Sequence, residues 1–176
     1  LSGMGQLVKT GWVDHHDGLL AIDHNHDGQI NSGAELFGSG TTLANGAKAA
    51  DGWAALAGLD TNADGVINAM DAQFADLRVW RDADGDGVTD AGELVSLADA
   101  GIASIGLAHD GSVTAQNGNL LMGQAVVTHT DGSTTQMTDA WLATEKLSGV
   151  EHPVAQAPAL DSSLATLNLV GLNDVQ

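Results

Sequence analysis

The sequence contains no cysteine, no tyrosine, only two prolines, and five lysines and arginines against 23 aspartates and glutamates in 176 residues. The missing cysteines exclude disulfide bonds, thiolate metal sites and cysteine nucleophiles. A formal net charge of −18 argues against binding nucleic acid or an anionic membrane, because both need clustered Lys and Arg. No apolar run reaches the roughly 18 residues of a transmembrane helix, and no charged-then-apolar signal peptide opens the chain.

The composition that remains favours a folded acidic domain. An apolar content of 43% can supply a core at this length, which argues against a disordered acidic chain. Many of the carboxylates fall in three short runs of Asp, Asn and Gly. The negative charge is therefore concentrated, and these runs are the first candidates for a functional site.

The run from Asp82 to Glu93 matches the EF-hand calcium loop, D-x-[DN]-x-[DN]-G-x₅-E, at every position. Alternate side chains of a tight loop converge on one point, glycine at position six permits the sharp turn, and the next carbonyl adds an oxygen. Hard oxygen ligands in this number favour Ca²⁺ over Mg²⁺. The predicted ligands are Asp82, Asp84, Asp86, the carbonyl of Val88, and Glu93.

A second run, Asp60 to Asp71, follows the same pattern with an aspartate in place of the closing glutamate. The shorter carboxylate can still bind calcium, and we expect a lower affinity. The predicted ligands are Asp60, Asn62, Asp64, the carbonyl of Val66, and Asp71.

The run that begins at Asp23 departs from the pattern at its end, because position twelve is Ala34 and the glutamate arrives one residue later. Either the loop accommodates an extra residue, or water completes the shell and the glutamate only caps the next helix. Calcium is again the predicted ion. The predicted ligands are Asp23, Asn25, Asp27, the carbonyl of Gln29, and Glu35.

The hydrophobic spacing predicts short helices around these loops and a sheet after them. We expect the loops at Asp23 and Asp60 to lie side by side, with Ile30 and Ile67 paired in a short two-stranded contact. Three Asp-Gly or Asn-Gly turns, at 110, 117 and 131, predict an antiparallel β-meander. The expected helices span 47–58, 69–80, 91–99 and 139–146, and the meander spans 102–138.

This order predicts an α+β fold, with short helices and EF-hand-like calcium loops followed by the meander. We expect a calcium-binding module over residues 1–147 and a linker with a C-terminal tail over 148–176, because both prolines, Pro153 and Pro158, fall in the second segment. The end of the tail forms either a short helix capped by Asp161 or a segment that docks elsewhere.

Other sites are weaker alternatives. Zinc could use the histidines near the first loop, but two of them occupy loop positions whose side chains point away from the ion. Asp14 and Asp17 could add an oxygen to a site or belong to a polar turn. The tryptophans fit the bulk of a core better than a sugar-binding platform. The histidines are His15, His16, His24 and His26, and the tryptophans are Trp12, Trp53, Trp80 and Trp141.

The combination of GAELFG, LRVW and a third loop ending in GEL, within residues 10–142, resembles the calcium-dependent self-processing module of RTX (repeat-in-toxin) exoproteins of the FrpC type. The resemblance implies secretion by the type I route and folding in extracellular calcium. It also implies cleavage of an Asp-Pro bond at the N-terminal edge of the module, after which the aspartyl group can join a lysine amine. The resemblance implies that Glu35 after Gly-Ala is a trait of this family, and the side-chain metal ligands named above carry over.

This chain lacks an Asp-Pro bond, since His152 and Ala157 precede its prolines, and no catalytic residue carries over. Three functions therefore stay open. The first is a calcium-binding, calcium-induced folding module of a secreted RTX-type protein, with no nucleic-acid partner and no membrane insertion. The second is the body of an autocatalytic module whose scissile bond lies upstream. The third is a calcium-stiffened adhesion or spacer module that binds a protein partner.

Overall fold

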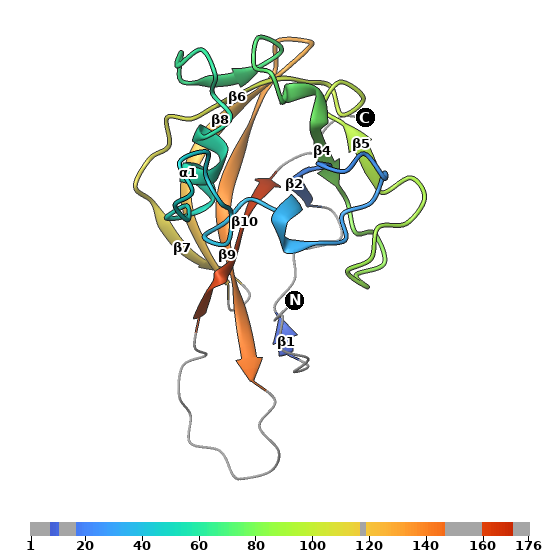
Figure 1. Ribbon diagram of the computed structural model, residues 1–176, viewed down its shortest axis with the longest axis vertical. Coiled ribbons are helices and arrows are strands. Elements are labelled where there is room, and N and C mark those ends of the chain that lie inside the picture. Colours follow the sequence, from blue (N-terminus) through green and yellow to red (C-terminus); the bar gives the residue numbers. More distant parts are fainter. Residues whose placement is uncertain (1–7, 11–16, 117–118, 147–159, 171–176) are drawn as a thin grey trace.

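The computed structural model describes residues 8–10, 17–116, 119–146 and 160–170, with the backbone alone for 8–10, 143–146 and 160–170. These ranges form ten strands, one short α-helix and two 3₁₀ turns (Figure 1). The elements are β1 (Val8–Thr10), β2 (Gly18–Ile22), η1 (Gly33–Glu35), α1 (Gly52–Ala57), β3 (Val66–Asn68), η2 (Phe74–Asp76), β4 (Leu77–Trp80), β5 (Leu94–Ser96), β6 (Ile102–Gly106), β7 (Val113–Gln116), β8 (Asn119–His129), β9 (Thr134–Lys146) and β10 (Leu160–Val170).

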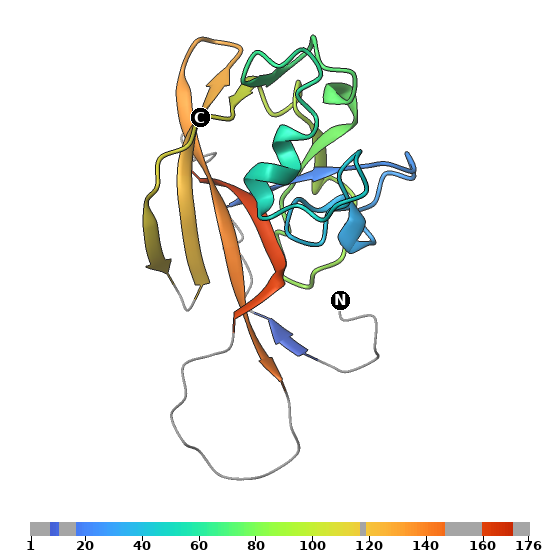
Figure 2. The same cartoon turned by 60° about the vertical axis from the view of Figure 1, so that its left-hand side comes forward.

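The strands form one antiparallel sheet with the order β3-β6-β8-β9-β10-β2-β4-β5, while β1 pairs with β9 and β7 pairs with β8. The last strand of the chain therefore lies in the middle of the sheet. On one side it pairs with β9, and on the other its Asn168 and Leu169 pair with β2. Figure 2 shows the long strands β8 and β9 along one side of the molecule, with α1 and the acidic loops on the other.

Two apolar clusters fill the space between the sheet and the loops. The larger one joins both halves of the sheet, and it includes Trp53 of α1 and Ile67 of β3. The smaller one joins β2 and β4 to the first acidic loop, and it consists of Leu19, Ala21, Ile30 and Trp80. Trp53 and Trp80 are buried, which confirms the core role predicted for them.

The predicted meander is confirmed in its main strands. β6 pairs with β8 and β8 pairs with β9, all antiparallel, while β7 pairs with β8 rather than with β6. The turn between β8 and β9 uses Gly132 at φ 85, with the Asp131 carboxylate accepting from the Ser133 N–H. Residues 117–118 lie outside the described part of the chain.

The helix predicted over 69–80 is wrong. Residues Phe74–Asp76 form only a 3₁₀ turn, and Leu77–Trp80 form β4, which pairs with β2 and β5. Met70, expected on the buried stripe of that helix, is 70% exposed. Leu77 and Val79 are buried in the larger cluster and Trp80 in the smaller one, so β4 is a strand with apolar contacts on both faces, which helical spacing alone could not distinguish.

Two further predicted helices are strands. Residues Leu94–Ser96 form β5 instead of a helix over 91–99, and residues 139–146 continue β9. The helix over 47–58 is confirmed in a shorter form as α1, where the Asp51 carboxylate caps the N-terminus by accepting from the Ala54 N–H at 2.7 Å. Pairing with neighbouring strands outweighed the modest helix propensity of these short segments.

Two more predictions are corrected. Of the two alternatives for the end of the tail, the short helix capped by Asp161 is wrong, because residues Leu160–Val170 form β10, which pairs with β9 and β2. Ile67 pairs with Ile105 of β6, whereas Ile30 contacts the loop that begins at Asp82. The described residues therefore form mostly antiparallel β-sheet with one short α-helix, and the α+β prediction is confirmed only in its sheet and its acidic loops. The division at residue 147 stays a prediction.

Candidate metal centres

The three acidic loops have the same backbone conformation. Loop one starts at Asp23, loop two at Asp60 and loop three at Asp82. In each, the first aspartate accepts from the N–H of the glycine at position six, at 3.1, 2.9 and 2.8 Å respectively. In each, the aspartate at position five accepts from the N–H at position seven. These bonds hold the acidic side chains toward the inside of each turn.

Position four of each loop has a left-handed backbone. His26 and Ala63 both have φ 57, and Gly85 has φ 75 at the matching position of loop three. Residues other than glycine adopt this conformation at a cost of about 1–2 kcal/mol. Three residues with different side chains thus share one backbone conformation at position four, which indicates that the loops have a common shape.

Loop one gathers carboxylates from both of its ends. Ligand atoms of Asp23, Asp27 and Glu35 lie within 4.8 Å of one another, although Asp23 and Glu35 are buried. The 3₁₀ turn η1 carries the extra residue of this loop. Its Ser32 Oγ accepts from the Ala34 N–H, and the Glu35 carboxylate accepts from the N–H of Ser32 at 3.1 Å. This capping box turns the late glutamate back toward the aspartates.

Loop three gathers a second set. Ligand atoms of Asp82, Asp84 and Asp86 lie within 4.8 Å of one another. Glu93 closes the loop from the other end, where its carboxylate accepts from the N–H groups of Ala83 and Asp90 at 2.9 and 3.0 Å. Both ends of the loop are therefore tied to one carboxylate.

Loop two is closed in the same way by a shorter side chain. The Asp71 carboxylate accepts from the N–H of Thr61 at 2.8 Å and from the N–H of Asn68 at 3.0 Å. The bond to Asn68, followed by those to Thr61, lowers the pKa of Asp71. In the described part of the chain Asp60, Asp64 and Asp71 do not converge as the carboxylates of loops one and three do.

The predicted amide ligands and the residues at position seven, which carry the predicted carbonyl ligands, also lie in the loops. The Asn25 amide contacts Asp27, and the Asn62 amide contacts Asp64, in both cases at 2.9 Å. Position seven is held by Gln29, Val66 and Val88, the three residues whose N–H groups are fixed by the aspartate before the glycine.

The acidic loops carry uncompensated charge. The N–H of Asp86 donates to Asp84 and lowers its pKa, but burial and the negative charges of neighbouring carboxylates raise it above 3.8 overall. Lys48 and Arg78, two of the five basic residues of the chain, donate instead to backbone carbonyls or a threonine hydroxyl. These two cations therefore do not pair with the loop carboxylates.

The donor set fits Ca²⁺. Oxygens bound to one calcium ion at 2.3–2.6 Å lie no more than about 5 Å apart, and the carboxylates of loops one and three meet this condition. The residues that would hold the ions are carboxylates and a backbone carbonyl in each loop, with an asparagine amide added in loops one and two, all of them hard oxygen donors. Magnesium, with its smaller shell and retained waters, fits this number of ligands less well.

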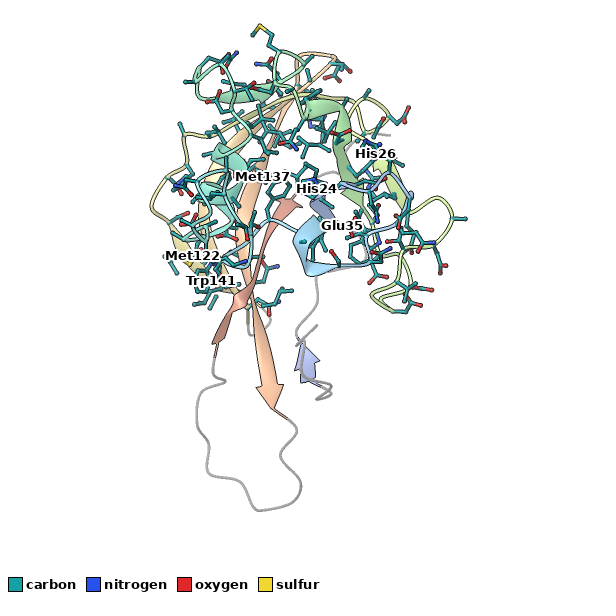
Figure 3. The ribbon with its side chains drawn as sticks, in the orientation of Figure 1. His24, His26, Glu35, Met122, Met137 and Trp141 are labelled. Carbon is teal, nitrogen blue, oxygen red and sulfur yellow. The ribbon has the colours of Figure 1, made fainter. Side chains whose placement is uncertain are left out.

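The histidines of the described ranges do not contribute to these groups. His24 and His26 are exposed at loop positions two and four, and His26 Nε2 lies 2.8 Å from the Asp76 carboxylate. Figure 3 shows both histidines on the same side of the molecule as Glu35. Within the described ranges, the groups of three candidate ligands consist of carboxylates only, and His15, His16, Asp14 and Trp12 lie outside those ranges.

Three residues with a part in these sites or beside them were missed by sequence analysis. Thr61 supports the closing carboxylate of loop two, and Thr89 contacts loop one from loop three. A comparison of position eight in the three loops would have pointed to Thr89, because it is the polar residue at that position. Asp139 of β9 is the third, and a buried carboxylate in a strand carries no sequence signal of its own.

Asp139 is 0% exposed and lies beneath α1, far along the sequence from the loops. One of its oxygens accepts from the Gly52 N–H at 3.0 Å and from Trp141 Nε1 at 3.1 Å. The other oxygen is buried without a hydrogen-bond partner. Burial, with the nearby negative charge of Asp51, raises the pKa of Asp139 to about 6.

Sheet and loops together define an antiparallel β module with acidic loops that can hold metal ions. Residues 1–143 match the family model of the SPM domain, and the chain therefore belongs to this family. The match confirms the resemblance to the self-processing module. The chain is also 45% identical, over 168 residues that cover 95% of it, to the iron-regulated protein FrpA of Neisseria meningitidis serogroup C. It spans only 15% of the length of that relative.

Proposed function

We propose that this chain is a calcium-binding module that folds when calcium binds, within a secreted RTX-type protein. The convergence of Asp23, Asp27 and Glu35 carries the proposal, because three carboxylates in this arrangement, two of them buried, repel one another without a cation. Loop three supports it with a second group of the same kind. The homology to FrpA, together with the RTX resemblance, supports a secreted parent protein.

The free energy of calcium binding is large enough to switch the chain from an unfolded to a folded state. Each site occupied at 100 times its dissociation constant stabilises the folded state by roughly 2.7 kcal/mol if the unfolded chain does not bind. Three such contributions are comparable with the net stability of about 5–15 kcal/mol of a whole domain. Three divalent ions would also offset six of the eighteen formal negative charges. Low cytosolic calcium would keep the chain loose enough for type I export, and extracellular calcium would fold it.

Isothermal titration calorimetry tests the proposal directly. Titration with CaCl₂ should show binding of three ions, and Glu35→Gln should weaken one of them by at least tenfold, because a neutral amide replaces the carboxylate that closes loop one. Asp131→Asn is the matched control, since this carboxylate caps the turn between β8 and β9 and belongs to none of the three loops. Equal calcium binding by the Glu35→Gln variant and the wild type would remove loop one from the account.

A second function follows from membership of the SPM family. In the full-length parent, the folded module would act as the body of a self-processing unit that cleaves an Asp-Pro bond upstream of Leu1. The N-terminal strand β1 pairs with the end of β9, so residues Val8–Thr10 are held on the sheet. A longer form carrying those upstream residues, incubated with calcium, should yield two fragments on a gel; an intact chain would exclude processing.

The third function, a calcium-stiffened adhesion or spacer module, differs in its outcome. It predicts a calcium-dependent complex with a protein partner and no broken bond. Within the described part of the chain, no helix is long and apolar enough to span a membrane.

A further inference from the structure

Position eight of each loop lies directly after the position-seven carbonyl, which is a calcium ligand in loops of this type. A contact made at position eight therefore moves with the ligand carbonyl. The residues at position eight are Ile30 in loop one, Ile67 in loop two and Thr89 in loop three. The partners of these residues decide which calcium sites act on one another.

Loops one and three are connected at this position. The Ile30 N–H donates to Thr89 Oγ1 at 3.0 Å, and the same hydroxyl lies 3.5 Å from the Ile30 carbonyl. The two residues are 59 positions apart in the sequence. A single threonine hydroxyl thus meets both backbone polar groups of Ile30, in the place where paired loops would exchange backbone hydrogen bonds.

Loop two has a different partner. Ile67 pairs with Ile105 of β6 and is buried in the larger apolar cluster. Its backbone is therefore joined to the β6-β8-β9 side of the sheet rather than to another acidic loop.

The apolar packing repeats this division. Ile30 packs in the smaller cluster with Trp80, and Leu36 and Leu94 pack against the same cluster. Leu36 follows the closing glutamate of loop one, and Leu94 follows the closing glutamate of loop three. A shift of either glutamate on ion binding is therefore passed to one shared group of side chains.

We propose that loops one and three form one cooperative pair of calcium sites coupled through the Thr89 hydroxyl, while loop two binds and releases its ion independently. The inference rests on the proposed function, since it assumes that the loops bind calcium. Coupling between two sites is reciprocal, so a change at Thr89 of loop three must also alter the affinity of loop one.

The release of calcium from the folded, saturated protein tests the coupling. Stopped-flow mixing with an excess of a chromophoric chelator should show two ions leaving together and one leaving in a separate phase. Thr89→Val keeps the shape of the side chain and removes the hydroxyl. It should accelerate the two-ion phase roughly threefold to tenfold, as expected for loss of one hydrogen bond, and leave the single-ion phase unchanged.

Two further variants serve as controls. Thr89→Ser retains the hydroxyl and should release calcium like the wild type. Thr61→Val removes the hydroxyl that supports Asp71 in loop two, and it should accelerate only the single-ion phase. Both Val substitutions make the same chemical change. Acceleration of the two-ion phase by one variant and of the single-ion phase by the other would therefore assign each phase to its loops.

The results that overturn the coupling are specific. If Thr89→Val accelerates the release of only one ion, Thr89 acts on loop three alone and does not couple the loops. If release is unchanged, or is faster for all three ions, the Thr89 hydroxyl does not couple loops one and three. If that variant does not fold, three independent phases in the wild type would overturn the coupling by themselves. A protein that yields no calcium to the chelator would instead refute the proposed function, and the coupling with it.

Discussion

Asp139 is a carboxylate that the folded protein holds away from water, with one oxygen bonded to the backbone of α1 and the other without a partner. Burial favours its neutral form, so the folded state keeps a proton that the unfolded chain has already released. Asp51 and His109 are the charged groups that act on it, and their effects on its pKa oppose one another.

The pH dependence follows from the raised pKa of Asp139. Its ordinary value is 3.8 and its folded value is about 6, so its contribution to stability is full below pH 3.8 and is lost as the pH rises through 6. Asp139→Asn removes this loss and should stabilise the calcium-loaded protein by about 2–3 kcal/mol at pH 8 relative to pH 4. Urea denaturation at both pH values measures it, and parallel curves for the two proteins would contradict the assignment.

Ala63 occupies a left-handed position of loop two without the freedom of glycine. Ala63→Gly should stabilise the calcium-loaded protein by about 0.5–1 kcal/mol, because relief of the backbone strain exceeds the added entropy of the unfolded chain. The reverse change at the matching position, Gly85→Ala, should destabilise by a similar amount, since no atom lies within 4 Å of the added Cβ. Chemical denaturation in saturating calcium compares them, and shifts of the same sign would show that the two loops differ in shape.

At the scale of the element, β8 depends on a glycine. Gly123 interrupts the β8-β9 register at φ 67, and an added Cβ would lie 2.8 Å from His109 Nδ1 and 3.0 Å from Trp53 Nε1. This close approach lets Trp53 donate to the Met122 carbonyl while its ring stacks on His109, with the centroids 4.9 Å apart. The irregular strand thus connects the sheet to α1, which precedes loop two.

Gly123→Ala should therefore destabilise the protein by about 2–4 kcal/mol, through both backbone strain and overpacking. Gly111→Ala is the matched control, because its Cβ would meet no atom within 4 Å, and it should change stability by less than about 0.5 kcal/mol. Thermal unfolding followed by tryptophan fluorescence measures both. Equal midpoints for the two variants would mean that the register shift in β8 tolerates a side chain.

The sequence predicted the clustering of carboxylates in loops one and three, and it predicted the elements between the loops poorly. Loop chemistry is local, because the spacing of Asp82, Asp84 and Asp86 already determines that their side chains converge. Strand formation depends instead on residues that are far apart in the sequence. β4 and β5 are short segments that form strands by pairing, β4 with β2 and β5 with β4. The spacing of apolar residues within either segment does not indicate this pairing.

Loop one shows the same limit within a site. The spacing alone left two alternatives for Glu35, and the structure shows a feature of each: Glu35 caps η1 in the capping box with Ser32, and its carboxylate also lies within 4.8 Å of those of Asp23 and Asp27. Its role as an ion ligand stays a prediction. The pairing of Ile30 was predicted with the wrong loop, because nearness in sequence favoured loop two, whereas the sheet brings loop three into contact.

For the whole molecule, the placement of β10 bears directly on the predicted boundary at residue 147. This strand joins the β3-β6-β8-β9 half of the sheet to the β2-β4-β5 half, although it follows the proline-containing segment that we expected to be a linker (Figure 1). At Asn168 the backbone has a neighbouring strand on each side, Thr138 of β9 and Leu19 of β2.

Proline cannot donate to a strand ladder, so Asn168→Pro should lower the melting temperature of the calcium-loaded protein by roughly 5–10 °C. Asn168→Ala is the control for the side chain and should have a much smaller effect. Differential scanning calorimetry measures both. An Asn168→Pro protein that melts like the wild type would place the tail outside the module and support a boundary near residue 147.

Circular dichroism with and without calcium tests the central claim most directly. In EDTA the far-ultraviolet spectrum should lack the strand signal and show no cooperative melting, because the carboxylates of three loops repel one another. Addition of millimolar CaCl₂ should restore both, while the same concentration of MgCl₂ should restore much less. A protein that is equally folded and equally stable in EDTA would contradict the account.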